Sequence, residues 1–268
     1  MKWLLCAITL LWPSAVQAQD SLRMAVTTSF HNSGLADVLL PEIQDDLGLE
    51  VQLLIVGTGQ ALRLGQAGDV DAIFVHSRAA EEAFVAEGYG THRREIMYND
   101  FVIVGPLDDP AGITDATDAA QSLGQIALAQ APFVSRGDDS GTHKKELSLW
   151  QDAGLDPTVS GDWYRAVGAG MGAALNTASA MEAYVLSDRA SWLNFANKGG
   201  LALLFAGDPA LFNQYAYLPV NAQRHPHVRS DLTAQLDDWL TSDRAAKLSN
   251  GYMIDGEQLF VFTAQTSE

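Results

Sequence analysis

The sequence predicts an α/β protein made of two lobes. Short apolar runs alternate with segments whose apolar residues recur at helical spacing, a pattern typical of strands joined by helices in a mainly parallel sheet. The chain has 268 residues, which is enough for two domains that each bury their own core. The alternation is interrupted near residues 105–110 and near 208–214, so we expect the chain to cross between the lobes at these two places.

The first lobe is predicted from four apolar runs that have the pattern of β-strands. The expected strands are Leu22–Thr27, Val51–Val56, Ala72–Val75 and Phe101–Val104. Helices are expected after the first three strands, over residues 35–43, from Ala61 to Gly65 or Gly68, and over Ala79–Glu87.

The rest of the chain continues the alternation. We expect a strand over Gln125–Ala129, helices over Ser140–Ala153 and Met171–Tyr184, an extended segment over Tyr215–Val220, and an amphipathic helix over Asp231–Leu240. The predicted first lobe comprises residues 19–106 and 212–268, and the second lobe, residues 107–211, is inserted into it.

Residues 1–18 have the pattern of a secretory signal peptide. Lys2 precedes an apolar run over residues 3–12, and small residues lead up to Ala18. The run has half of the ~20 apolar residues that a membrane-spanning helix needs, so we expect cleavage near Ala18 and a periplasmic protein. Cys6 is the only cysteine, so the predicted mature chain can form no disulfide and no cysteine-ligated metal site.

Composition and charge exclude several classes of function. With 47% hydrophobic and 18% charged residues, the chain resembles an ordinary globular protein and not a disordered or fibrous one. Its formal net charge of -17 argues against a general nucleic-acid binder and against a protein that binds anionic membranes.

Polar segments follow the predicted strands at the points where helices are expected to begin. They are Thr27-Thr28-Ser29, Gly57-Thr58-Gly59, His76-Ser77 and Ser135-Arg-Gly-Asp-Asp-Ser-Gly-Thr-His143. In open α/β sheets ligands lie at the carboxyl ends of strands, and helix N-termini bind anions through unpaired N–H groups. Each segment alone is better explained by helix capping and turns. Their shared position favours an anion site.

Arg136 stands within the longest of these segments in an otherwise acidic chain. A guanidinium is always charged and presents a rigid fork of donors to an oxyanion. Arg136 could instead pair with Asp138 or Asp139 at the surface, and both roles are compatible when a neighbouring carboxylate orients the fork.

Several motifs between about Leu22 and Asn221 carry a family resemblance. They are Val26-Thr-Thr-Ser29, Val56-Gly-Thr-Gly-Gln60, Tyr98-Asn-Asp-Phe-Val-Ile-Val-Gly105, the segment Ser135–His143, Gly170-Met171-Gly172 and Tyr184-Val-Leu-Ser-Asp-Arg189. Together they resemble the periplasmic tungstate-binding proteins of Tup-type ABC transporters. The spacing of Arg136, Ser140 and Thr142 also resembles the anion loop of periplasmic phosphate-binding proteins.

The resemblance implies a type II periplasmic-binding-protein fold, in which two α/β lobes close over one oxyanion at a hinge cleft. It implies a monomeric binding component of an ABC importer that docks on a membrane permease, with no catalytic activity and no cofactor. The expected oxyanion-binding residues are Thr27, Thr28, Ser29, Thr58 and Ser77 from the first lobe and Arg136, Ser140, Gly141 and Thr142 from the second. No metal is expected apart from the metal centre of the bound oxyanion.

Val26 departs from the family motif, which usually reads Thr-Thr-Thr-Ser. If Val26 faces the core of the sheet, the site loses nothing. If Val26 faces the ligand, one donor is missing.

The expected donors also predict which oxyanions bind. Phosphate carries a proton near neutral pH and needs a carboxylate acceptor, whereas the segment Phe74–Ser77 offers a hydroxyl and no aspartate. A proton that faces only donors costs about 1–3 kcal/mol, so tungstate, molybdate or sulfate is expected to bind in preference to phosphate. The choice of tungstate rests on the resemblance.

Other functions fit the sequence less well. Ser140 and His143 could suggest a serine hydrolase, but no orienting carboxylate and oxyanion hole are evident. The glycine pairs at Gly57 and Gly168 lack the G-x-G-x-x-G pattern of a dinucleotide site. His225-Pro-His227 shows no metal-binding spacing with other ligands, and a carbohydrate or peptide binder would not need the loop around Arg136.

Overall fold

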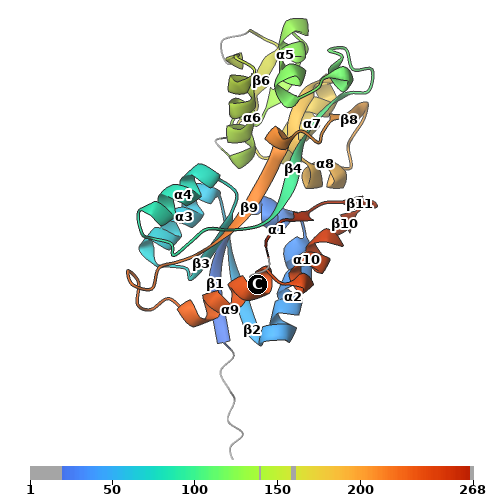
Figure 1. Ribbon diagram of the computed structural model, residues 1–268. Coiled ribbons are helices and arrows are strands. Elements are labelled where there is room, and N and C mark those ends of the chain that lie inside the picture. Colours follow the sequence, from blue (N-terminus) through green and yellow to red (C-terminus); the bar gives the residue numbers. More distant parts are fainter. Residues whose placement is uncertain (1–19, 139, 158–160, 266–268) are drawn as a thin grey trace, which may run out of the picture.

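The computed structural model describes residues 20–138, 140–157 and 161–265. The predicted signal peptide, with Cys6, therefore lies outside the described residues. The described chain forms two α/β lobes, one above the other, and long strands run from one lobe into the other (Figure 1). No described helix combines the length and the apolar character needed to cross a membrane.

The first lobe is built on the strands β1, β2, β3, β9 and the first half of β4. β1 pairs in parallel with β2 and β3, and its last residue, Thr27, lies opposite Val56. β9 pairs antiparallel with both β3 and β4. The bounds are β1 (Asp20–Thr27), β2 (Leu49–Val56), β3 (Ala72–Val75), β4 (Arg94–Pro106), β9 (Phe212–Pro219) and the short β12 (Val261–Phe262), which pairs with β4.

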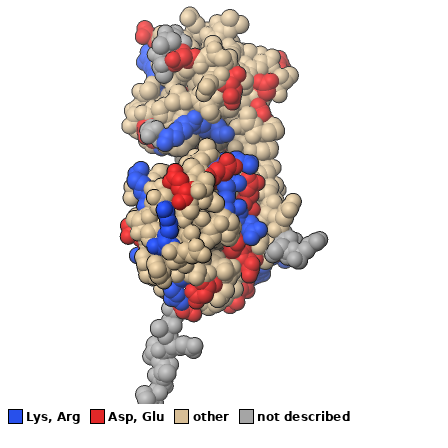
Figure 2. Space-filling model, turned by 60° about the vertical axis from the view of Figure 1, so that its left-hand side comes forward, with Lys and Arg blue, Asp and Glu red and all other residues tan. Residues whose placement is uncertain are grey.

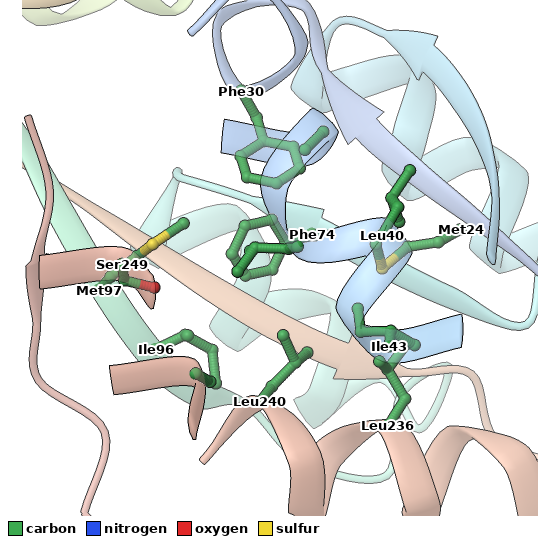
Figure 3. Close-up of a pocket in the computed structure, with 13 residues that line it drawn as sticks. Met24, Phe30, Leu40, Ile43, Phe74, Ile96, Met97, Leu236, Leu240 and Ser249 are labelled. Carbon is green, nitrogen blue, oxygen red and sulfur yellow. The ribbon is translucent and has the colours of Figure 1, made fainter. Parts of the chain in front are cut away.

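Helices cover both faces of this sheet, and each face has its own apolar cluster. One cluster includes Leu22, Val26, Phe30 and Leu236, and the other includes Ala61, Phe84 and Leu218. The first cluster surrounds a small apolar cavity between Phe30, Phe74 and the C-terminal helices (Figure 3). The helices are α1 (Thr28–Asn32), α2 (Leu35–Leu47), α3 (Thr58–Ala67), α4 (Arg78–Ala86), α9 (Ser230–Leu240) and α10 (Asp243–Asn250), followed by the hairpin β10 (Met253–Ile254) and β11 (Glu257–Gln258).

The second lobe repeats this layered arrangement around the second half of β4. Its strands are β5 (Phe133–Ser135), β6 (Tyr164–Ala166), β7 (Tyr184–Asp188) and β8 (Leu201–Phe205). Its helices are α5 (Ala119–Ala129), α6 (Gly141–Asp152), α7 (Met171–Met181) and α8 (Arg189–Asn194), with the 3-10 turns η1 (Ile113–Asp115) and η3 (Pro209–Leu211). Separate apolar clusters around Trp150 and around Leu175 fill its two faces.

The strand order is β2-β1-β3-β9-β4-β7-β5-β6, and the change of partner within β4 connects the lobes. Residues up to Asp100 pair with β9, whereas Phe101 to Val104 pair with β7. The predicted division at residues 106 and 212 stays a proposal.

Three expectations from the sequence are wrong in detail. Gln125–Ala129 is not a strand but the end of α5, because Asp118 caps this helix and Ala119, Leu123 and Ile126 bury one helical face. The helix from Met171 ends at Met181, and Tyr184 begins β7. The sheet is mixed and not mainly parallel, since every pairing made by β4 and β9 is antiparallel.

Candidate ligand-binding pocket

A pocket lies between the two lobes and receives residues from both. Figure 2 shows the groove between the lobes, with basic side chains along its upper edge. The first lobe contributes the ends of β1, β2 and β3, and the second contributes the loop after β5, the start of α6 and the end of β7. The lining residues are Thr27, Thr28, Ser29, Gly57, Thr58, His76, Phe101, Arg136, Ser140, Gly141, Thr142, Asp188 and Asn213.

The segment Thr27–Ser29 forms the junction between β1 and α1. Thr27 caps the helix, since its Oγ1 accepts a hydrogen bond from the backbone N–H of Phe30 at 3.3 Å. The Oγ atoms of Thr27 and Ser29 lie 3.0 Å apart. Val26 is fully buried in the apolar cluster of the first lobe, so its side chain faces the core and this departure from the family motif removes no donor from the pocket.

Ser29 lies at the centre of a partly buried polar network. Its Oγ is 3.0 Å from Nε2 of His76 and 3.0 Å from the hydroxyl of Tyr215. Burial lowers the pKa of His76 to about 4, aided by the charge of Lys145 and opposed by a bond to its own backbone carbonyl, so the ring is neutral at pH 7. A serine hydroxyl donates only one hydrogen bond, so Ser29 acts as acceptor in at least two of its three contacts.

The crossing strands extend this network below the pocket. Nδ2 of Asn213 on β9 donates to Oδ1 of Asn99 on β4 at 2.9 Å, and both side chains are buried. Burial raises the pKa of Tyr215, whose hydroxyl is also approached by Asn99. The tyrosine therefore keeps its proton, and the network ties the hinge strands to the hydroxyls at the start of α1.

Arg136 follows β5 and enters the pocket from the second lobe. Its Nη2 lies 2.5 Å from Oδ2 of Asp138, and its Nη1 donates to Oγ1 of Thr142 at 3.4 Å. Its Nε is buried and has no hydrogen-bond partner in the described part of the chain. Burial acts to raise the pKa of Asp138, but hydrogen bonds from Ser140 and Arg136 outweigh burial and lower the pKa overall. Asp138 thus orients a guanidinium that retains unused donor capacity.

The start of α6 lies directly opposite His76. Ser140 caps this helix through its Oγ, which accepts from the backbone N–H of His143 at 3.2 Å. Gly141 is so close to the first lobe that an added Cβ would lie 2.9 Å from Cε1 of His76. The first N–H groups of a helix have no partner within the helix, so α6 presents donors to the pocket where Gly141 lies close to His76.

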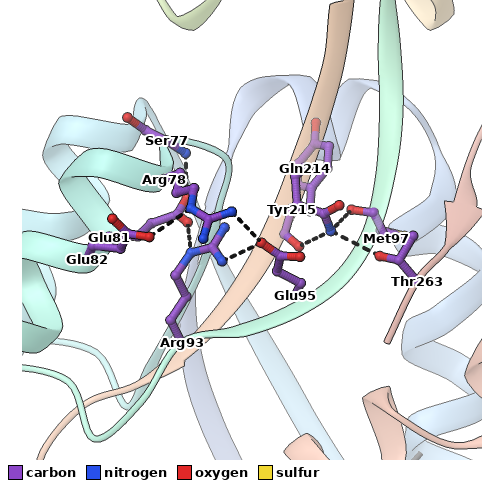
Figure 4. A network of polar contacts seen from close by, with 10 residues as sticks. All are labelled: Ser77, Arg78, Glu81, Glu82, Arg93, Glu95, Met97, Gln214, Tyr215 and Thr263. Carbon is purple, nitrogen blue, oxygen red and sulfur yellow. Dashed lines mark hydrogen bonds and ion pairs between the residues drawn. The ribbon is translucent and has the colours of Figure 1, made fainter. Parts of the chain in front are cut away.

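The structure brings together eight of the nine residues predicted to bind the oxyanion. Ser77 is not among the residues that line the pocket: its backbone N–H donates to Oε1 of Glu81, which also pairs with Arg93 (Figure 4). His76, its neighbour, lines the pocket instead. The binding role of all nine residues stays a prediction.

Sequence reasoning missed Phe101, Asp188 and Asn213 as pocket residues. Phe101 and Asp188 face each other across the β4–β7 ladder, and Asn213 comes from β9. Asp188 falls within a motif that carried the family resemblance and lies where a strand ends and a helix begins, but the prediction did not include this junction. The helix-start signal used for the other residues does not extend to Asn213, which lies within a strand.

The described residues contain no group of three or more His, Cys, Asp or Glu side chains placed to hold a metal ion. Nε2 of His225 lies 3.0 Å from the carbonyl oxygen of Gln66, and Nε2 of His227 lies 2.8 Å from that of Gly68. These two rings therefore hold a loop against α3.

Known proteins resemble this chain in sequence and in fold. The family profile described as a PBP superfamily domain matches residues 13–244. A curated tungstate-binding protein, TupA of Peptoclostridium acidaminophilum, is 43% identical over 88% of this chain and 82% of its own length. A putative ABC transporter anion-binding protein of Haloferax volcanii is 43% identical over 90% of this chain and 71% of its own length. The solved structure of the tungstate-binding protein TupA of Desulfovibrio alaskensis G20 is 42% identical, covers 92% of this chain and all of its own, and superposes with a TM-score of 0.87.

Proposed function

The chain belongs to the PBP superfamily and, within it, to the family of TupA tungstate-binding proteins, and from this premise we propose that it captures tungstate for an ABC importer. It acts as the extracytoplasmic binding component of the importer, with no catalytic role. A membrane permease is its partner, it works as a monomer, and the segment that ends near Ala18 directs it to the periplasm.

The pocket between the lobes is the observation that carries this proposal. It combines hydroxyls from the first lobe, the start of α6 from the second lobe and one guanidinium. In a site shielded from water, such donors stabilise a dianion without requiring a strongly basic protein. Thr27, Thr28, Ser29 and Thr58 are assigned to the first lobe's share of the ligand, and Arg136, Ser140, Gly141 and Thr142 to the second lobe's share.

The pocket does not meet the expectation of a site lined by hydrogen-bond donors only, because an aspartate, Asp188, is among its lining residues. The preference for tungstate over phosphate therefore does not follow from a missing acceptor. Tungstate rests on the likeness to the TupA relatives, and molybdate, sulfate and phosphate remain the ligands to compare.

Thermal melting of the purified chain with tungstate, molybdate, sulfate and phosphate tests the proposal. A ligand at 1,000 times its Kd stabilises the folded state by about 4 kcal/mol, which for a chain of this size corresponds to a shift of about 8 °C or more in Tm. We expect the largest shift with tungstate and none with chloride at the same ionic strength. The absence of a Tm shift with all four oxyanions contradicts the proposed function. A Tm shift with phosphate alone identifies phosphate, and not tungstate, as the ligand.

A further inference from the structure

Asp188 is the one acidic residue among the described residues that line the pocket. It is the last residue of β7 and is 7% exposed. Its Oδ1 accepts a hydrogen bond from the backbone N–H of Ser191 at 2.9 Å and so caps α8. No described arginine or lysine forms an ion pair with its carboxylate, which is also hydrogen-bonded to the side chain of Ser191.

The groups that face Asp188 do not neutralise it. Arg136, on the loop after β5, attracts the carboxylate but is already paired with Asp138. His76, on the loop after β3, is neutral at pH 7, and Tyr215, on β9, keeps its proton. Arg189, the next residue, pairs with Asp100 and Glu257 away from the pocket. Because Asp138 is paired with Arg136, the Asp188 carboxylate, when ionised, is the charge that lacks an ion-pair partner among these described groups.

A dianion that enters this pocket meets a buried carboxylate of the same sign. Two like charges in a site of low dielectric cannot both persist at close range, and a proton held between them removes the repulsion. We propose that Asp188 makes this pocket bind an oxyanion together with one proton, which the carboxylate and an oxyanion oxygen share in a hydrogen bond. This inference rests on the proposed function and names the residue that determines its proton dependence.

The proton has a defined source for each class of anion. An unprotonated dianion such as tungstate binds with one proton taken from solvent, whereas hydrogen phosphate brings its own. No covalent bond other than that to the proton forms or breaks. Burial raises the pKa of Asp188, and hydrogen bonds from Ser191 and the charge of Arg136 only partly oppose this effect. Protonation of this carboxyl is thus easier than for an aspartate in water.

Titration calorimetry with sodium tungstate between pH 7.0 and 8.5 tests the inference. Measurement in two buffers with different ionisation enthalpies, HEPES and Tris, counts the protons taken up per tungstate. Where the free carboxyl is ionised, the wild-type chain is expected to take up about one proton per tungstate, and its Kd is then expected to rise about tenfold per pH unit. In Asp188→Asn the proton uptake and the pH slope are expected to disappear, because an amide donates to the anion without titrating.

Three comparison variants separate Asp188 from other groups. Asp118→Asn changes an aspartate that caps α5 in the same lobe, outside the pocket. Glu146→Gln changes a buried carboxyl behind the Arg136 loop, which is bonded to Tyr164 and Trp150. His76→Gln removes the imidazole that lies beside Ser29 in the pocket. Asp118→Asn is expected to bind tungstate as the wild type does, and in Glu146→Gln and His76→Gln, whatever their affinity, each bound tungstate is expected still to bring one proton.

Tungstate binding by the wild-type chain without proton uptake overturns the inference and leaves the proposed function standing. Uptake that persists in Asp188→Asn, or that disappears in His76→Gln or Glu146→Gln, also overturns it. The wild-type proton count requires no variant, so the test holds even if Asp188→Asn fails to fold. No binding of any of the four oxyanions overturns the proposed function itself.

Discussion

Arg136 is the only lysine or arginine among the described residues that line the pocket. Its side chain is held by Asp138, and it reaches Thr142 at the start of α6. Lysine carries the same charge but lacks the planar fork that matches two oxyanion oxygens. A substitution that keeps the positive charge of Arg136 but removes its planar guanidinium therefore tests whether the guanidinium geometry is needed.

We predict that Arg136→Lys weakens tungstate binding at least tenfold, which corresponds to about 1.4 kcal/mol. Calorimetric titration of the two proteins measures the difference. Arg165→Lys, at an exposed position in the same lobe, serves as the matched control and is expected to bind as the wild type does. Equal affinities for Arg136→Lys and the wild type remove Arg136 from the site.

Gly141, at the start of α6, lies close to His76 of the first lobe. A Cβ there would lie 2.9 Å from Cε1 of His76, a ring that is held by Ser29 and cannot move aside freely. Gly141→Ala is expected to keep the lobes slightly apart and to weaken tungstate binding about tenfold, with little change in the Tm of the ligand-free protein, because parting the lobes relieves the clash.

Gly124→Ala provides the comparison for this variant. Gly124 lies in α5 of the same lobe, where an added Cβ meets no atom within 4 Å. Alanine there should leave binding unchanged and raise stability by about 0.4–1 kcal/mol. If Gly141→Ala binds tungstate as tightly as Gly124→Ala does, the close approach of the lobes has no part in binding.

Individual pocket residues could be predicted where a helix starts at the end of a strand. Thr27, Thr58 and Arg136 follow this rule, because the local sequence itself marks the junction. At the end of β3 the rule identified the right segment but the wrong residue, since successive residues point in different directions and His76, not Ser77, enters the pocket. Asp188 also lies at such a junction, between β7 and α8, but the prediction did not include it. Asn213 lies within a strand and joins the site only through the pairing of strands distant in sequence.

At the scale of whole elements, the strands and helices of the first lobe largely matched their prediction. Ala72–Val75 was predicted with its observed bounds. The strand expected over Gln125–Ala129 failed because a short apolar run fits either a strand or one face of a helix, and the Asp118 cap upstream decides between them. The antiparallel centre was missed because β4 and β9 pair across more than 100 residues of sequence, a separation that local patterns do not reveal.

One buried ion pair joins two of these elements. Glu81 on α4 is fully buried, and its Oε2 lies 2.6 Å from Nε of Arg93, just before β4 (Figure 4). The other oxygen of Glu81 accepts from the backbone N–H of Ser77, next to the pocket residue His76. This pair therefore supports the loop that carries His76.

We predict that Arg93→Met lowers the free energy of unfolding by about 3–5 kcal/mol, because it leaves the Glu81 carboxylate buried without its cation. Urea denaturation followed by circular dichroism gives the value. Arg78→Met is the control: the Arg78 side chain is 70% exposed and pairs with Glu82, so its loss should cost less than about 1 kcal/mol. Equal losses for the two variants contradict the structural role of the buried pair.

At the scale of the whole molecule, the two lobes have separate apolar clusters and are joined through β4 and β9. This division places the pocket between two lobes with separate cores, so a ligand that bonds to both lobes links them. The presence of two lobes could be predicted from the chain length and from the two interruptions in the alternation of predicted strands and helices. The close approach of the lobes at His76 and Gly141 could not be predicted, because it depends on how the crossing strands orient one lobe relative to the other.

The central claim is that one oxyanion is held by both lobes at once. Crystals grown with sodium tungstate, measured at the tungsten LIII absorption edge, locate the metal directly through its anomalous scattering. The account predicts a single strong peak in the pocket, with tungstate oxygens within about 3.2 Å of donors from the Thr27–Ser29 segment and from Arg136 and the start of α6. A peak outside this pocket, or one contacted by a single lobe, would contradict the account.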